Sequence, residues 1–181
     1  MIFSDHNDNS LEAMLERHTK QQELKEKALE YYMLAANQNH ADAQVRVGES
    51  FDCHDENGIK WYRKAADQGN ANAQSILGNC YEFGNGVEKN LEKAFEWYLK
   101  SAKNGDKGAQ YCLGMFYEKG YVGACDIEKA VYWYEKAAAQ GVMDAQNCLN
   151  NIQLGRRNSP IVIDGSREPT LAERIKWKLG F

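Results

Sequence analysis

Four consecutive residues, Asp52-Cys53-His54-Asp55, carry side chains of the types that ligate metal ions. Zinc takes four ligands in a tetrahedron, and its motifs supply them in spaced pairs such as Cys-x-x-Cys. No such pair and no His-x-x-x-His accompanies this cluster, so we interpret it as a polar turn without a metal. No spacing supports a general base or a Cys–His pair among the histidines, which are His6, His18, His40 and His54.

Two further patterns could suggest chemistry. The loop Gly84-Asn85-Gly86 resembles a phosphate cradle, but it lacks the preceding strand and the following Lys-Ser/Thr of that motif. Cys112 and Cys148 lie 36 residues apart, and we expect both to be small buried apolar residues. The total of five cysteines shows no disulfide framework and favours a reducing compartment. We therefore expect no enzyme activity and no cofactor.

Composition narrows the class of protein. The 181 residues suffice for one domain with a core. A formal net charge of −4 argues against binding of nucleic acid, which needs a basic surface. The start of the chain has neither a basic segment nor an apolar core, so we expect no secretory signal. No stretch approaches the ~20 apolar residues of a membrane span. These observations predict a cytoplasmic protein that binds neither nucleic acid nor a membrane.

An internal repeat runs through the chain. The pair Ala-Gln recurs at steps of 30, 36 and 36 residues, at 43–44, 73–74, 109–110 and 145–146. Two other kinds of residue pair keep the same register. An aliphatic residue followed by glycine occurs at Val47-Gly48, Leu77-Gly78 and Leu113-Gly114, and a Trp-Tyr pair occurs at Trp61-Tyr62, Trp97-Tyr98 and Trp133-Tyr134. Independent markers in one register indicate a repeat architecture.

Each repeat contains two short helices. In the clearest copy, Ala73, Leu77 and Tyr81 lie on one face of a helix over 71–83, and a second helix covers 91–103. No proline occurs before Pro160, so the chain can be helical throughout this region. We expect left-handed glycines to end the second helices, at 69, 105 and 141. The helical glycines at 48, 78 and 114 predict close approach of a neighbouring helix, because glycine otherwise costs about 1 kcal/mol there.

The consensus Ala-x-Ala-Gln-x-x-Leu-Gly-x-x-Tyr, followed by Glu-Lys-Ala-x-x-Trp-Tyr, resembles the Sel-one-like repeat (SLR) family, relatives of tetratricopeptide repeats, over about residues 24–154. The resemblance implies an all-α, right-handed superhelical solenoid of about four antiparallel helix pairs. We place this solenoid at residues 10–154, after a frayed segment 1–9. Leu11 and Leu15 fall where Leu77 and Tyr81 lie, which predicts a degenerate first helix with Glu12 in place of glycine.

Some secreted, cysteine-rich members of the family pair cysteines across each repeat, and β-lactam hydrolysis or binding has been attributed to them. The matching positions of this chain hold Ala66, Ala102 and Ala138. A hydrolase is therefore the least favoured interpretation.

Residues 155–181 depart from the repeat. They carry six basic and three acidic residues, a net charge of +3 on an acidic chain. Thr170-x-x-Glu173 reads as a capping box for a short helix near 170–179, with Leu171, Ile175 and Leu179 as its apolar stripe. This tail could cap the last repeat, which would otherwise expose an apolar face. It could also dock a partner through Trp177.

Positions that vary between repeats and face inward are candidates for partner binding. On the first helix of the third repeat these are Asn72, Ser75 and Asn79, which share a face. The equivalent positions are Asp42, Val45 and Glu49, then Gly108, Tyr111 and Met115, then Asp144, Asn147 and Asn151. Tyr111 beside Met115 is a candidate apolar anchor in a polar to acidic surface. Ordinary solvated positions are the alternative.

The resemblance implies a protein-protein interaction module, an adaptor or scaffold whose concave face binds another protein. We expect a basic contact surface on the partner, facing Asp42, Glu49 and Asp144, because complementary potential sets orientation and association rate. A monomer is favoured. An immunity protein that neutralises a toxin by tight binding is the alternative, which rests on analogy alone.

Overall fold

The structure is a computed structural model that describes residues 8–52 and 55–158, with side chains described for 11–52 and 55–155. This part of the chain is helical and contains no strand, which confirms the predicted all-α class. Its eight helices are α1 (Asp8–Asn37), α2 (Ala41–Glu49), α3 (Glu56–Asp67), α4 (Ala71–Phe83), α5 (Leu91–Lys103), α6 (Lys107–Lys119), α7 (Ile127–Ala139) and α8 (Met143–Asn158).

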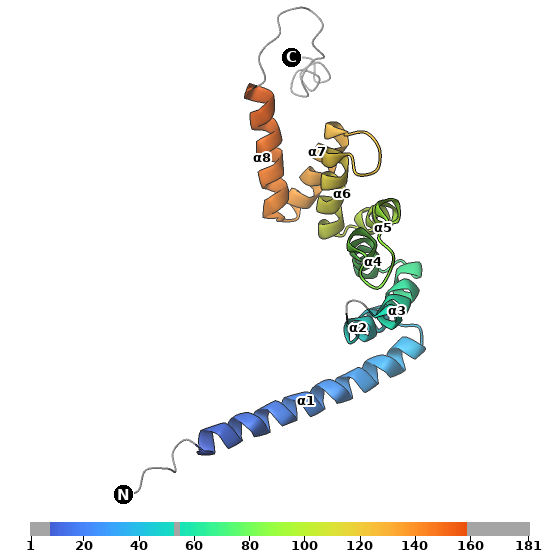
Figure 1. Ribbon diagram of the computed structural model, residues 1–181, viewed down its shortest axis with the longest axis vertical. Helices are drawn as coiled ribbons and strands as arrows, with labels where there is room; N and C mark the ends of the chain where they lie inside the picture. Colours follow the sequence, from blue (N-terminus) through green and yellow to red (C-terminus); the bar gives the residue numbers. More distant parts are fainter. Residues whose placement is uncertain (1–7, 53–54, 159–181) are drawn as a thin grey trace, which may run out of the picture.

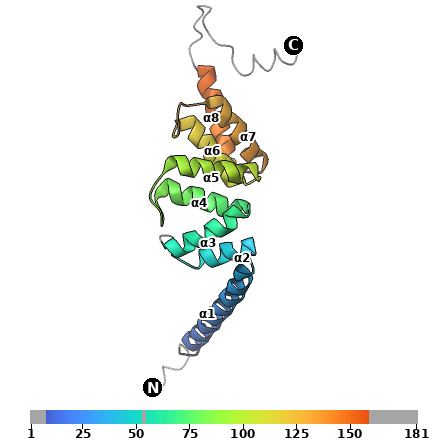
Figure 2. The ribbon, with the colours of Figure 1, turned by 90° about the vertical axis from the view of Figure 1, so that its right-hand side faces the viewer.

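The helices stack in chain order into a solenoid. Each helix packs mainly on the helices before and after it, and the pairs α2/α3, α4/α5 and α6/α7 form the repeat units. Figure 2 shows the stack from α1 to α8 along one axis. In Figure 1 the stack is curved, with α2 and α4 on its inner side and α3 and α5 on its outer side.

Side chains at the helix ends explain where the helices begin and stop. Asn70, Asn90, Asp106 and Asp126 each accept a hydrogen bond from a backbone N–H in the first turn of the next helix. The predicted left-handed glycines follow the outer helices, with φ of +88°, +93° and +85° at 69, 105 and 141. In the first unit Asn39 takes this position with φ of 69°, since asparagine tolerates the left-handed region better than most residues.

The helical glycines allow an aromatic ring to approach the inner helix. A Cβ atom at Gly48 or Gly78 would lie 2.6 Å from the ring of Tyr62 or Tyr98 on the outer helix of the same pair. Gly114 lies against Tyr134 in the same way. The close approach predicted from the sequence is therefore confirmed, and the neighbour is the tyrosine of the Trp-Tyr pair.

The first repeat departs from the predicted helix pair. A single helix of 30 residues, α1, replaces a degenerate first helix and a separate second one. Gly84 and Gly86 interrupt the chain between α4 and α5, whereas residues 16–25 contain neither glycine nor proline. Helix-forming Lys, Gln, Glu and Leu residues fill most of that stretch, so the chain continues as one helix.

The last helix extends past residue 154, where the sequence analysis placed the end of the solenoid. Helix α8 continues to Asn158, four residues beyond the predicted end of the solenoid at 154. The predicted helix near 170–179 lies outside the described residues.

We predict that Gly78→Ala lowers the free energy of unfolding by about 1–3 kcal/mol, because the new Cβ atom would overlap the buried ring of Tyr98. Gly155→Ala is the matched control, since nothing lies within 4 Å of a Cβ atom there. The control should unfold at equal or higher urea concentration because alanine is the better helix former. Equal destabilisation by both substitutions would contradict the proposed steric role of Gly78.

Candidate partner-binding surface

Buried glutamines of the Ala-Gln pairs hold the inner helices in place. In the third unit, the Nε2 atom of Gln74 donates to the carbonyl of Ala66 at the end of α3, at 3.0 Å. Its Oε1 atom accepts a hydrogen bond from Asn104, at the end of α5, at 3.0 Å. Each such glutamine therefore links three successive helices.

The same arrangement repeats along the solenoid. Gln44 donates to the carbonyl of Ala36 and accepts from Gln68, and Gln110 donates to the carbonyl of Ala102 and accepts from Gln140. We call Gln44, Gln74, Gln110 and their side-chain partners Gln68, Asn104 and Gln140 the amide ladder. At the next repeat position Gln146 is exposed and donates to Asn150 of its own helix.

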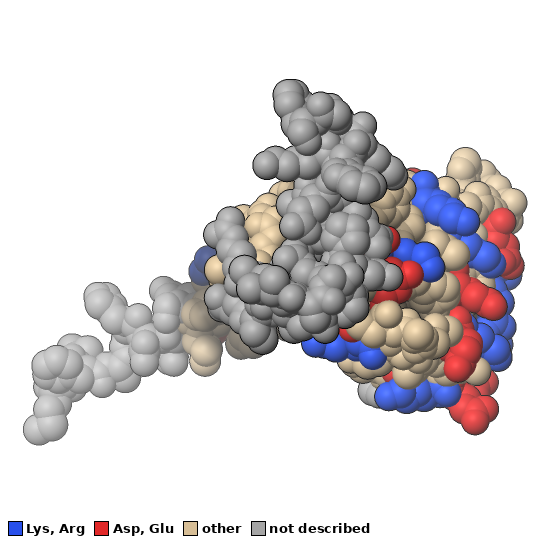
Figure 3. Space-filling view, turned by 90° about the horizontal axis from the view of Figure 1, so that it is seen from above, with Lys and Arg blue, Asp and Glu red and all other residues tan. Residues whose placement is uncertain are grey.

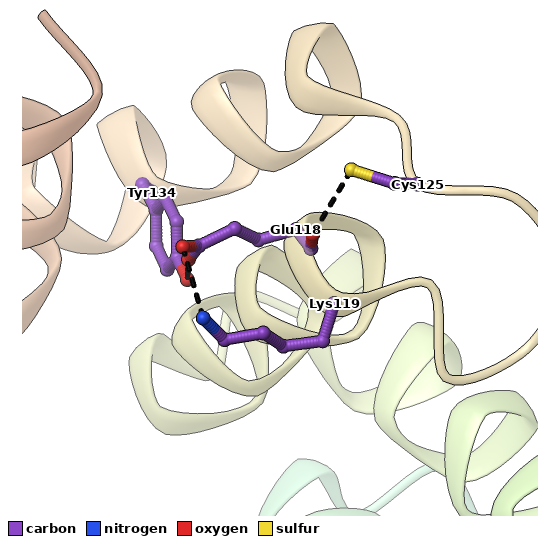
Figure 4. Close-up of polar contacts among 4 residues, drawn as sticks. All are labelled: Glu118, Lys119, Cys125 and Tyr134. Atoms are coloured by element: carbon purple, nitrogen blue, oxygen red, sulfur yellow. Dashed lines mark hydrogen bonds and ion pairs between the residues drawn. The ribbon is translucent and has the colours of Figure 1, made fainter. Parts of the chain in front are cut away.

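Tyrosine hydroxyls link the two helices at the other end of the pairs α4/α5 and α6/α7. Tyr98 donates to Glu82 at 2.8 Å, and Tyr134 donates to Glu118 at 2.6 Å. Figure 4 shows the second contact, with Lys119 paired to the same carboxylate and the thiol of Cys125 on the Glu118 carbonyl. Burial is the main cause that raises the pKa of the Tyr98 and Tyr134 hydroxyls, so both stay protonated as donors.

This framework presents several of the predicted binding residues on the inner helices. Asp42 and Glu49 of α2, Asn72 and Asn79 of α4, and Asp144 of α8 are exposed, and Ser75 is half-buried. Val45, which shares their face in the sequence pattern, is buried at 4% exposure and belongs to the core instead.

Two acidic members of this set already have partners. Asp42 accepts a hydrogen bond from the Asn70 side chain at 2.7 Å. Glu49 forms an ion pair with Arg46 at 2.9 Å on the same helix. Because the Arg46–Glu49 pair is largely exposed, it contributes little to stability and leaves Glu49 accessible.

Tyr111 and Met115 of α6 are half-buried and pack against a core cluster formed by α7 and α8. The ring centroids of Tyr111 and Tyr134 lie 5.8 Å apart. Burial, with Cys148 and Asp144 nearby, raises the pKa of Tyr111. Each of these two side chains therefore packs against the core with one part and is exposed to solvent with the other. Trp177 lies outside the described residues.

The outer helices carry a feature that the repeat analysis did not identify as a contact. Lys64, Lys100 and Lys136 each lie over the tryptophan three residues earlier, 4.2, 4.1 and 5.7 Å from the ring centroid of Trp61, Trp97 and Trp133. The spacing Trp-x-x-Lys at the repeat interval was the signal in the sequence that could have predicted these contacts.

The outer surface carries charges of both signs. Along the right-hand edge of Figure 3, the side of α3 and α5 in Figure 1, acidic and basic side chains alternate.

The sequence analysis did not predict that the glutamines of the amide ladder are buried, although Ala-Gln was the clearest repeat marker. A polar residue that recurs with the core alanine could have indicated a buried hydrogen bond.

The described part of the chain offers neither a metal-binding cluster nor a membrane-spanning helix. No group of three His, Cys, Asp or Glu side chains there could hold a metal ion. Cys53 and His54 of the Asp52–Asp55 cluster lie outside the described residues. None of the described helices has both the length and the hydrophobicity to cross a bilayer.

A family model described as Sel1 repeat matches residues 21–40, 55–70, 71–106 and 108–142. A comparison with curated proteins gives no match. The chain is similar in structure to a protective antigen of uropathogenic Escherichia coli strains that displays an SLR fold, with a TM-score of 0.62 and 34% identity. The alignment covers 66% of this chain but only 27% of that antigen.

Two shorter structures are covered almost completely. A Sel1 repeat protein from Oxalobacter formigenes is similar with a TM-score of 0.64 and 37% identity, over 69% of this chain and 98% of the other. Helicobacter pylori cysteine rich protein B is similar with a TM-score of 0.56 and 26% identity, over 68% and 92% respectively.

We predict that Gln110→Leu lowers the free energy of unfolding by about 1–3 kcal/mol, because it leaves the Ala102 carbonyl and the Gln140 amide without this partner. The matched control is Gln146→Leu, at the exposed equivalent position, which should change stability by less than about 0.5 kcal/mol. Urea unfolding of both variants checks this, and equal effects would show that the ladder adds nothing.

Alkaline pH should destabilise the fold through its tyrosines. Burial raises the pKa of Tyr62 to about 12, whereas tyrosines of an unfolded chain ionise near pH 10. The folded state therefore holds protons that the unfolded state loses, and the free energy of unfolding falls as pH rises from about 10 to 12. Tyr62→Phe should reduce this fall, and Tyr31→Phe, at a side chain 74% exposed, should not. A pH-independent unfolding midpoint in the parent would contradict the prediction.

Proposed function

The chain belongs to the Sel1 repeat family, and we propose that it is a non-enzymatic adaptor that binds a partner protein on the inner face of its solenoid. Proteins of this family are generally protein-interaction modules. The observation that carries the proposal is the row of exposed side chains at equivalent positions of the inner helices, from Asp42 on α2 through Asn72 on α4 to Asp144 on α8.

The framework behind this row favours binding without rearrangement. Inner helices α2, α4 and α6 are fixed by buried contacts, the tyrosine rings on one side and the amide ladder on the other. A surface ordered before binding loses less conformational freedom when a partner docks, which raises affinity.

Charge and shape indicate the kind of partner. Asp42, Glu49 and Asp144 are exposed carboxylates at three inner positions, and they favour a partner with a basic contact surface. Tyr111 and Met115 supply the half-buried apolar centre between them. The described cysteines, Cys80, Cys112, Cys125 and Cys148, are free thiols, which supports a cytoplasmic setting.

Photocrosslinking in the native cell tests the binding face. A photoreactive amino acid at Asn79, exposed on inner helix α4, should crosslink a partner protein. The matched control is the same amino acid at Glu96, exposed on outer helix α5. One stoichiometric toxin-like partner would support the immunity role, and several looser partners the adaptor role. Crosslinks from Glu96 alone would overturn the inner-face proposal.

With the crosslinked partner purified, Tyr111→Ala should weaken its binding by about thirtyfold, as for a central aromatic anchor. Glu49→Lys should slow association and reduce its salt dependence, whereas Glu96→Lys should do neither. Calorimetry and stopped-flow mixing measure these effects, with urea unfolding as a check that each variant is folded. Folded variants at Tyr111 and Glu49 that bind like the parent would exclude this surface.

A further inference from the structure

We propose that Asn85 is a modification site, at which the side-chain amide is lost spontaneously and an isoaspartyl residue is left in the loop between α4 and α5. This inference does not depend on the adaptor function. It rests on a comparison of three chemically equivalent positions, because the sequence Asn-Gly occurs at 57–58, 85–86 and 104–105 and the fold holds each of them differently.

The chemistry needs only the chain itself and water. In an Asn-Gly pair the backbone nitrogen of the glycine attacks the side-chain carbonyl carbon of the asparagine, since glycine has no side chain to block the approach. A bond forms between that nitrogen and that carbon, and ammonia leaves with the proton that the backbone nitrogen gives up. Water then opens the imide ring at either of its carbonyls, which leaves an aspartyl or an isoaspartyl residue. The reaction therefore requires a free glycine N–H and a side chain that can rotate toward it.

Asn104 is held away from this reaction by the amide ladder. Its Nδ2 atom donates to the carbonyl of Gly69 at 3.2 Å and to the Oε1 atom of Gln74 at 3.0 Å. The glycine nitrogen is engaged as well, because the N–H of Gly105 donates to the carbonyl of Ala102 at 3.1 Å. Attack would break all of these bonds, so Asn104 reacts only when this end of α5 opens.

Asn57 is held by helix α3. It lies in the first turn of the helix, where its N–H donates to Asp55 at 2.8 Å and its side-chain oxygen accepts from Lys60 at 3.2 Å. The next residue, Gly58, is buried, and a Cβ atom there would lie 3.2 Å from the carbonyl oxygen of Gly48. Moving the Gly58 nitrogen toward the Asn57 side chain would therefore disturb both the helix and its close contact with α2.

Asn85 has none of these restraints. Within the described part of the chain, its side chain forms no hydrogen bond, and neither does the N–H of Gly86. The loop is anchored on either side of this peptide bond, because the N–H of Asn85 donates to the carbonyl of Cys80 at 2.9 Å and the N–H of Asn90 donates to the carbonyl of Tyr81 at 2.8 Å. Figure 2 shows the loop at one edge of the stack. The Asn85 side chain and the Gly86 nitrogen therefore meet without the opening of a helix.

The repeat framework requires an amide at 104 but not at 85. The equivalents of Asn104 are Gln68 and Gln140 of the amide ladder, and a carboxylate at 104 would face the two acceptor oxygens named above. The equivalents of Asn85 and Gly86 in the next unit are Tyr121 and Val122. An isoaspartyl residue at 85 therefore adds a negative charge and an extra backbone atom to the loop without breaking a bond of the amide ladder.

Mass-spectrometric peptide mapping of the folded full chain, incubated at mildly alkaline pH, tests the proposal. The peptide with Asn85 should gain the mass of the amide-to-acid conversion at least about tenfold faster than the peptides with Asn57 and Asn104, because opening of a hydrogen-bonded segment limits those two. In urea the three should convert at similar rates, since they share the Asn-Gly sequence and the fold is lost. Equal rates in the folded protein, or faster conversion at 57 or 104, would overturn the proposal.

Two variants test the product. An isoaspartyl carboxyl methyltransferase should transfer methyl groups from S-adenosylmethionine to the incubated parent chain, and Asn85→Gln should remove this signal because glutamine closes a larger ring more slowly. The matched control Asn104→Gln, which introduces the residue found at 68 and 140, should keep the signal. Circular dichroism and urea unfolding check that both variants are folded. An incubated parent chain that accepts no methyl group, or a signal that persists in Asn85→Gln, would overturn the proposed site.

Discussion

The contact between a tyrosine ring and a helical glycine sets the geometry on which the rest of the solenoid depends. At 48, 78 and 114 the inner helix has no side chain, so the ring of Tyr62, Tyr98 or Tyr134 lies directly on its backbone. This distance fixes how closely each pair is packed. The same tyrosines then reach a carboxylate with their hydroxyls in two of the pairs. One residue type thus sets both the separation and the alignment of the two helices.

The units are joined by a different kind of contact. Gln44, Gln74 and Gln110 are buried amides. Each donates a hydrogen bond to the end of the preceding outer helix and accepts one from the end of the outer helix in its own pair. A buried amide without a partner costs free energy, so each glutamine disfavours arrangements that break its bonds. Tight packing within pairs and directional bonds between them leave the exposed inner positions free to vary, and these are the positions proposed for partner binding.

Much of this was predictable because it is local. The glycine contacts and the left-handed glycines at 69, 105 and 141 follow from positions where any other residue is costly. The long α1 was not predicted. The repeat pattern at Leu11 and Leu15 suggested a separate short helix, although helix-forming residues continue without a break through residues 16–25. The half-burial of Tyr111 and Met115 depends on α7 and α8, which one helix's periodicity does not reveal. The binding role of the exposed inner residues stays a prediction.

The position of the amide ladder has a mechanical consequence. Its bonds all lie where outer helices end and the next inner helices begin, as with Gln74 bound to Ala66 and Asn104. Gly84 and Gly120 begin the loops at the opposite edge of the stack. If the solenoid flexes while the bonds of the amide ladder stay intact, the edge that carries the ladder must act as the hinge. Its compliance is then directional, with the loop edge taking up most of the displacement.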